Sequence, residues 1–271
     1  MADEISPVKT INRLVRVLDC FTPDQPTWSL AELSAHLNLP KSTLHRFLLG
    51  LDTFGILRRD AVDKRWRLGY RLFVWGNLAA DSTDLRNVAH PILRQLMAET
   101  GESAILTIYQ DGEVLCLDKV ETTQPVRMTM TIGSRRPPHA GSSSKVLMAY
   151  LSRSEVETII REQGLPKLCI NTITDPIELL SELEQIRAQG YARSLEETDL
   201  SAWGVAAPVF GWKEGQVAAA VGIAGPTSRY DEQRIEEYIR LCRRAADQIS
   251  QRLRSADCSE RTDLARMAVD S

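Results

Sequence analysis

The sequence lacks the patterns that mark several common classes of protein. It has no Cys-x-x-Cys pair and no cysteine near a histidine at zinc-ligand spacing, because its five cysteines are scattered at positions 20, 116, 169, 242 and 258. No apolar run approaches the roughly 20 residues that a membrane-spanning helix needs, and Met1–Pro7 has acids but no apolar core, unlike a signal peptide. Neither a GxxxxGK phosphate loop nor a GxGxxG dinucleotide motif occurs. We therefore expect a cytoplasmic protein with reduced thiols, no metal and no cofactor.

Charge is unevenly distributed along the chain. The 271 residues, enough for one or two domains with a sizeable core, carry a formal net charge of −3. Residues 41–71 hold eight basic and three acidic side chains, a local balance of +5 that leaves −8 for the remainder. A basic segment on an acidic body is typical of nucleic-acid-binding proteins. A solvated surface of mixed charge is the alternative, which charge alone does not reject.

Two short helices are predicted on either side of a tight turn. Ser29 can cap a helix over 30–37, and Glu32, three residues later, completes a capping box. Pro40 suits the start of the next helix over 41–51, where apolar residues recur on one side. This arrangement is the helix-turn-helix pattern.

A basic hairpin and a further helix are predicted next. Residues 55–59 and 65–68 are strand-like and flank a polar turn at 60–64, an arrangement typical of the wing of a winged helix-turn-helix. Residues 70–80 are expected to form a helix that links two domains.

Beyond Gly101 the sequence becomes rich in β-strand signals. Strands over 103–109 and 113–120 flank Asp111-Gly112, a strong hairpin signal. More strands are expected at 126–132, 204–210 and 216–224, and helices at 84–100, 144–151, 154–163, 176–189 and from Asp231 to about Arg254. The prediction is an α+β domain in which helices pack on an antiparallel sheet, not a βαβ alternation.

These predictions divide the chain into four parts. They are a winged helix-turn-helix at 1–69, a linker helix at 70–81, a second domain at 82–258 and a disordered polar tail at 259–271.

Short motifs between Lys9 and Arg254 follow one another in a characteristic order and spacing. They are Leu30-Ala31-Glu32-Leu33, Leu39-Pro40-Lys41-Ser42-Thr43-Leu44-His45-Arg46, Arg67-Leu68-Gly69, Pro138-His139, Lys145-Val146-Leu147-Met148-Ala149, Asn171-Thr172-Ile173-Thr174, Gly190-Tyr191-Ala192, Glu196-Glu197, Ala206-Ala207-Pro208-Val209 and Gly225-Pro226. In these motifs the chain resembles the IclR family of transcription regulators. The resemblance implies a GAF-like second domain that binds a small-molecule effector. It also implies that the protein forms homodimers or homotetramers that bind palindromic operators in double-stranded DNA. Such a regulator would activate or repress a catabolic operon.

The helix at 41–51 is the expected DNA-reading element. A helix entering the major groove needs short polar or cationic side chains on its leading face, with apolar residues behind. The residues expected to contact DNA are Lys41, Ser42, Thr43, His45 and Arg46 in this helix and Arg58, Arg59, Lys64, Arg65 and Arg67 in the wing. The alternatives are that Ser42 and Thr43 only cap the helix, that His45 touches no base and that the wing is merely solvated.

The resemblance also implies the effector residues. They are Met128, Ser142, Ser143, Ser194, Gly204, Gly222 and Ala224. Other family members carry Cys or Ser at the three strand positions, 204, 222 and 224, and often Asp at position 194, so this pocket should be wider and less polar at its base. We therefore expect an aromatic or medium-sized organic acid, whose carboxylate meets the loop hydroxyls and the helix start at Lys145, with help from Arg135, Arg136 and His139. The alternative is that the serines cap the helix and the glycines only pack closely.

Two other functions are considered. Ser142 and Lys145 form the Ser-x-x-Lys string of some acyl-transfer hydrolases, but the companion Ser-Asp-Asn and Lys-Thr-Gly motifs are absent. The chain is therefore not expected to be an enzyme. A sensor or scaffold whose helix-turn-helix binds protein is the remaining alternative, and the basic excess of residues 41–71 argues against it.

Overall fold

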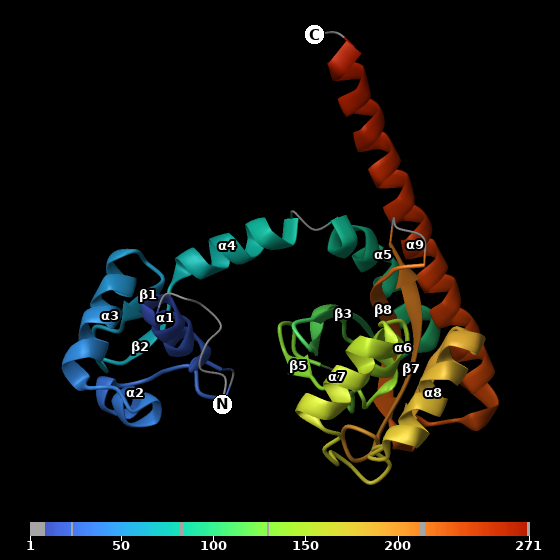
Figure 1. Cartoon of the computed structure of the whole chain (residues 1–271), viewed down its shortest axis with the longest axis horizontal. Helices are drawn as coiled ribbons and strands as arrows, with labels where there is room; N and C mark the ends of the chain where they lie inside the picture. The colour runs from blue at the N-terminus through green and yellow to red at the C-terminus, as the bar shows by residue number, and fades with distance from the viewer. Residues whose placement is uncertain (1–8, 23, 82–83, 129, 212–214, 270–271) are drawn as a thin grey trace. The chain divides into compact units, whose positions relative to one another are not determined.

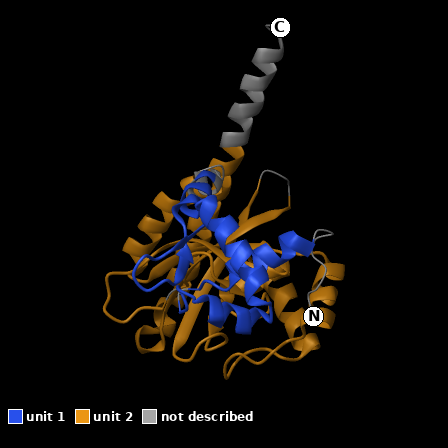
Figure 2. Ribbon diagram, turned by 90° about the vertical axis from the view of Figure 1, so that its left-hand side faces the viewer, with its two compact units in different colours: residues 1–82 blue, residues 83–271 orange. Residues whose placement is uncertain are grey.

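The computed structural model describes residues 9–22, 24–81, 84–128, 130–211 and 215–269. They form two compact units, residues 1–82 and 83–271, which Figure 2 distinguishes by colour. Each unit is described by itself. Of the expected features, Met1–Pro7 lies outside the described residues. No helix within the described ranges is long and apolar enough to cross a membrane.

The first unit contains the predicted helix-turn-helix. Its elements are α1 (Lys9–Asp19), α2 (Leu30–Leu37), α3 (Lys41–Thr53), β1 (Leu57–Arg59), β2 (Trp66–Leu68) and α4 (Tyr70–Asp81). The Ser29–Glu32 capping box forms at the start of α2, as predicted. Asn38 ends α2 in the left-handed conformation at φ 52°, which turns the chain sharply toward α3.

The wing is a two-stranded antiparallel sheet. Leu57 pairs with Leu68 and Arg59 with Trp66, so the turn between the strands projects at residues 60–65. Trp66 is 1% exposed and packs with the leucines of α2 and α3, which anchors the hairpin to the helices.

The second unit is built on a six-stranded antiparallel sheet of order β5-β4-β3-β8-β7-β6. The strands are β3 (Ser103–Gln110), β4 (Glu113–Val120), β5 (Arg135–Arg136), β6 (Ala192–Leu195), β7 (Ala202–Phe210) and β8 (Val217–Pro226). Asp111 and Gly112 join β3 to β4 with φ values of 53° and 83°. Two positive φ angles are what a type I′ hairpin requires, so this predicted hairpin is confirmed.

Helices cover both faces of the sheet (Figure 1). On one face, α5 (Asp84–Thr100) and α9 (Glu232–Val269) bury a core around Leu93, Leu106 and Val205. On the other face, α6 (Ser142–Ala149), α7 (Arg153–Gln163) and α8 (Pro176–Gln189) bury a second core. The predicted α+β class, with an antiparallel sheet and packed helices, is confirmed.

The structure differs from the sequence-based expectations at three places. The third strand expected over Val126–Ile132 is wrong: apart from Thr129, outside the described residues, this stretch belongs to no strand, and the next strand is the short β5. The strand β6 was not expected. The last helix was expected to end at about Arg254, but α9 continues to Val269, and residues 255–269 contain neither glycine nor proline. Residues 270–271 lie outside the described part.

Strands β7 and β8 pack so closely at Gly222 that a single added methyl group should destabilise the fold. A Cβ atom at Gly222 would lie 2.3 Å from the Val205 carbonyl oxygen and 2.8 Å from the Ala206 Cβ atom. Gly222→Ala should therefore lower the free energy of unfolding by about 1–3 kcal/mol, measured by chemical denaturation of the full chain. Gly50→Ala is the control, because its Cβ would meet no described atom within 4 Å beyond its chain neighbours and the backbone of its own helix. Equal stability of the two variants would contradict the tight contact.

Candidate functional site

The helix α3 has one buried and one exposed side. Leu44 and Leu48 are fully buried against α1, α2 and the wing. Lys41 and Arg46 are exposed on the other side, and neither makes a hydrogen bond or ion pair with any described residue. The predicted separation of anchoring and presenting residues is therefore present in the structure. Ser42 is also exposed, and Thr43 and His45 are half-buried.

The start of α3 carries no side-chain cap. Pro40 occupies the capping position, and neither Ser42 nor Thr43 bonds to the first turn. The suggestion that these hydroxyls serve only as caps therefore finds no support. The backbone N–H groups of the first turn have no acceptor within the helix, so the N-terminus of a helix can bind a phosphate.

The basic residues of the wing are not equivalent. Arg65 bonds to Glu32 at 2.6 Å and to Thr27, so it fastens the wing to the start of α2. Arg67 pairs with Asp63 at 2.7 Å and with Asp60. By contrast, three cations form no ion pair with a described residue: Arg58, which lies over Tyr70, Arg59, which lies over Trp66, and Lys64. Sequence spacing could not separate these groups, because Glu32 is 33 positions from Arg65, and Asp60 and Asp63 are within a few positions of paired and unpaired cations alike.

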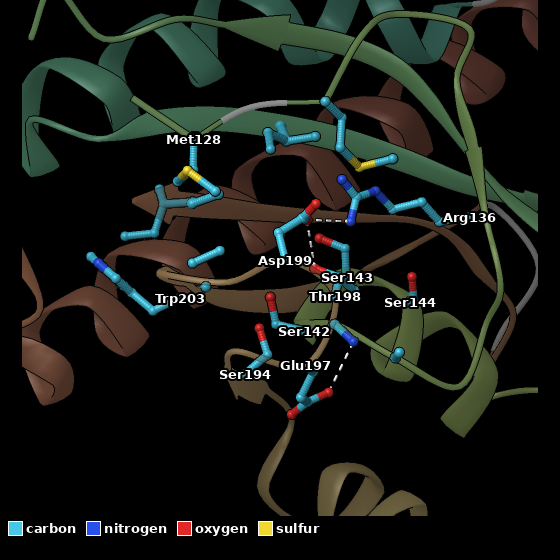
Figure 3. Close-up of a pocket in the computed structure, with 18 of the residues that line it drawn as sticks. Met128, Arg136, Ser142, Ser143, Ser144, Ser194, Glu197, Thr198, Asp199 and Trp203 are labelled. Atoms are coloured by element: carbon cyan, nitrogen blue, oxygen red, sulfur yellow. Dashed lines mark hydrogen bonds and ion pairs between the residues drawn. The ribbon is translucent and has the colours of Figure 1, made fainter. Parts of the chain in front are cut away.

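The second unit contains a cavity of about 210 Å³ between the start of α6 and strands β3, β6, β7 and β8 (Figure 3). Its apolar wall includes Ile105, Met128, Trp203 and Ile223, and its polar wall includes Arg136, Ser142, Ser143, Ser144, Ser194, Glu197, Thr198 and Asp199. The cavity therefore combines an apolar wall with hydrogen-bonding groups, as small-molecule sites do.

A buried ion cluster holds the loop that precedes α6. Lys145 is 2% exposed, and its Nζ atom donates to Glu182 and Glu197, both at 2.7 Å. The second oxygen of Glu197 accepts the Gly141 N–H at 2.9 Å. Glu197 therefore connects the buried ammonium to the backbone at the first residue before α6, and this positions the serine hydroxyls in the cavity wall.

Gly204 leaves room for two of these hydroxyls. A Cβ atom there would lie 2.8 Å from Ser142 Oγ and 3.4 Å from Ser194 Oγ. Neither hydroxyl forms a hydrogen bond with a described residue. No side chain caps the start of α6 either. Two unpartnered hydroxyls and the free N–H groups of a helix start thus converge on one part of the cavity.

A second polar group lines the cavity at Arg136 and Asp199. The Nη1 atom of Arg136 donates to Asp199 Oδ2 at 2.6 Å, and the Thr198 hydroxyl donates to the same oxygen at 3.0 Å. Burial raises the pKa of Asp199, but the hydrogen bond and charge of Arg136, together with the hydrogen bond of Thr198, lower it by more, so this carboxyl has a pKa below its ordinary value. Figure 3 shows Arg136 and Asp199 turned toward each other and away from Ser142 and Ser194.

Most of the expected effector residues line this cavity. They are Met128, Ser142, Ser143, Ser194, Gly204 and Ala224. The expectation that Gly222 lines the cavity is wrong. Gly222 packs against β7, where the strands are too close to leave room for a side chain. Arg135 and His139 also lie elsewhere: Arg135 bonds to the Gln110 carbonyl oxygen, and His139 is buried against the Pro166 carbonyl oxygen. Burial lowers the pKa of His139.

Sequence reasoning did not identify Asp199, Ile105 and Trp203 as wall residues. Asp199 follows the paired glutamates by only two positions, but its partner Arg136 is 63 residues away. The alternation of side chains along β3 predicts that Ile105 faces one side of the sheet, but it does not predict on which side the cavity lies.

The chain matches known proteins over most of its length. Residues 10–61 match the IclR helix-turn-helix domain, and residues 77–251 match the family described as "Bacterial transcriptional regulator IclR C-terminal". The transcriptional regulator KipR of Bacillus subtilis is 34% identical, over 90% of this chain and 97% of KipR. The transcriptional repressor IclR of Escherichia coli is 31% identical, over 90% of this chain and 89% of the repressor.

Solved structures agree with these sequence matches. An IclR homolog from Microbacterium hydrocarbonoxydans, crystallised in complex with 4-hydroxybenzoate, has a TM-score of 0.81 and 29% sequence identity, and the match covers 90% of this chain and 99% of that one. The helix-turn-helix with its wing and the α+β unit with its cavity are thus the two parts of one known architecture. The chain belongs to the IclR family of bacterial DNA-binding transcription regulators.

Proposed function

We propose that this protein regulates a catabolic operon by binding a palindromic operator through α3 and the wing, under the control of an organic acid bound in the cavity. The observation that carries the proposal is the exposed side of α3, where the cations of Lys41 and Arg46 are unpaired within the described residues. Unpaired cations beside an uncapped helix start suit phosphates and base edges.

The proposed DNA contacts differ in kind. Arg46 reads guanine in the major groove, and Lys41 neutralises a backbone phosphate. The other contacts come from Ser42, Thr43, His45, Arg58, Arg59 and Lys64. Arg65 and Arg67 chiefly hold the wing in shape, because carboxylates already neutralise them.

The proposed effector carboxylate lies at the start of α6. The N–H groups of the first turn and the hydroxyls of Ser142, Ser143 and Ser194 supply donors there. An aromatic ring suits the apolar wall beside Met128 and Trp203. A cavity of about 150 Å³ holds one benzene ring, so the 210 Å³ here leave room for a ring with small substituents.

A dimer is proposed as the DNA-binding form. The exposed side chains of Tyr70, Phe73, Val74 and Leu78 recur at three- and four-residue spacing on α4 and form an apolar stripe. A two-fold pairing of such stripes would bury them and match two half-sites of a palindrome.

The geometry favours a regulator over a hydrolase. The Lys145 ammonium already donates to two carboxylates, so it is not placed to take a proton from Ser142. The salt dependence of binding distinguishes a DNA-binding helix-turn-helix from a protein-binding one. Affinity for DNA falls steeply as the salt concentration rises, because phosphate contacts release counterions.

Two substitutions in α3 separate base contacts from phosphate contacts. Lys41→Ala should weaken binding to operator DNA, selected from a random pool, and to unselected DNA by the same factor, and should lower the salt slope by about one unit. Arg46→Ala should cost about 1–3 kcal/mol on the selected DNA alone. Arg252→Ala, an exposed cation of α9, is the control. The measurement is a shift assay across a salt series; salt-independent binding would refute the DNA interface.

Another prediction concerns the cavity. An organic acid that binds should raise the unfolding midpoint of the full chain. Gly204→Ala should abolish that rise, because the added methyl group crowds the Ser142 hydroxyl. Gly211→Ala is the control, since its Cβ would meet only Ala218, at 3.3 Å, and the Gln216 carbonyl oxygen. An unchanged midpoint across aromatic and aliphatic acids would count against an acid effector.

A further prediction concerns assembly. Phe73→Glu, at a side chain that is 70% exposed on α4, should halve the mass seen by light scattering at micromolar concentration. Val62→Glu places the same charge at the exposed wing and should leave the mass unchanged. A monomeric wild-type protein, or a variant of unchanged mass, would refute the α4 dimer.

A further inference from the structure

We propose that Arg136 and Asp199 form a second polar subsite of the effector cavity, which recognises a neutral hydroxyl group at the end of the effector away from its carboxylate. This inference rests on the proposed function of the cavity as an acid-binding site. It specifies which functional group the effector carries at the end opposite its carboxylate.

The pair offers unused hydrogen-bonding groups of both kinds. Arg136 uses only its Nη1 atom on Asp199, and no described residue accepts from its Nε or Nη2 atoms. Asp199 uses Oδ2 for both of its partners, while Oδ1 accepts nothing from the described residues. The two neighbouring side chains therefore offer both donors and an acceptor in the cavity wall.

A hydroxyl group satisfies both sides of this pair at once. It accepts from the guanidinium of Arg136 and donates to the free oxygen of Asp199. The ion pair is neutral as a whole, and the low pKa of Asp199 keeps it so near neutral pH. A second carboxylate would meet the charge of Asp199, and an ammonium would meet that of Arg136.

The ion pair is not needed to hold the fold. The side chains of Arg136 and Asp199 are 28% and 44% exposed, and ion pairs so open to solvent contribute little to stability. The loop before α6 is instead held by the buried Lys145 and Glu197. Substitution of either member should therefore leave a folded cavity, in which ligand preference can be measured.

The two polar groups that would hold the ends of the ligand lie in different parts of the cavity wall. The hydroxyls of Ser142 and Ser194 converge at Gly204, apart from the Arg136–Asp199 pair (Figure 3). Ile105 and Met128 complete the wall with apolar atoms. The ligand class that fits is a ring-containing acid with a hydroxyl remote from its carboxylate.

The test uses acids that differ only at the remote position. Calorimetry on the full-length protein compares benzoate with 4-hydroxybenzoate, and 3-phenylpropanoate with 3-(4-hydroxyphenyl)propanoate, because the two pairs differ in length. In at least one pair the hydroxylated acid should bind about tenfold tighter or more. Terephthalate, with a second carboxylate in place of the hydroxyl, should bind more weakly than 4-hydroxybenzoate.

Variants assign that preference to the pair. Arg136→Met and Asp199→Ala should each reduce the hydroxyl preference to near one, while the affinity for the unhydroxylated acid changes little. Arg135→Met removes the neighbouring cation, which lies outside the cavity, and should keep the full preference. The unfolding midpoint without ligand checks that each variant is folded.

Other results would overturn the inference in distinguishable ways. If Arg136→Met weakens both acids of a pair equally, Arg136 binds the carboxylate, and the subsite assignment fails while the acid-binding function stands. A preference for terephthalate, or no hydroxyl preference in the wild-type protein, also refutes the subsite. If no acid binds the wild-type protein, the proposed function and the subsite fail together.

Discussion

The buried ammonium of Lys145 is the interaction on which the effector-binding unit depends. It lies between Glu182 of α8 and Glu197 of the loop after β6, and Glu197 also binds the backbone before α6. Removing one partner of such a buried cluster is strongly destabilising, because an uncompensated charge remains. Three segments distant in the chain are therefore held together, and the start of α6 is held in its place in the cavity wall.

Charge serves opposite purposes in the two units. In the first unit, leucines behind α3 leave Lys41 and Arg46 exposed, with no partner among the described residues, while Glu32 and Asp63 neutralise the cations that shape the wing. In the second unit, the charges that line the cavity are paired, so a ligand meets oriented hydrogen-bonding groups more than net charge. Free cations attract any phosphate backbone, whereas paired groups discriminate between small molecules.

Local signals predicted elements well where a single residue type has a specific conformational effect. The capping box of Ser29 and Glu32 located α2, and Asp111-Gly112 located the hairpin of β3 and β4. Two predictions that used pattern or composition alone failed. Residues 126–132 alternate like a strand, but the segment gives its side chains Met128 and Met130 to the cavity wall without joining the sheet. The last helix was expected to end at about Arg254, but residues 255–269 contain no glycine or proline, and α9 continues through them.

The sequence by itself determined the fold class, the helix-turn-helix with its basic wing, and the loop hydroxyls at Ser142 and Ser143, because these follow from periodicity, capping and motif order. Only the tertiary structure decided which cations stay unpaired, that Gly222 packs while Gly204 opens the cavity, and that Arg136 meets Asp199. The physical reason is distance along the chain. Capping and turn geometry act within a few residues, whereas the fold brings ion-pair partners together from 33 positions apart for Arg65 and Glu32 and from 63 for Arg136 and Asp199.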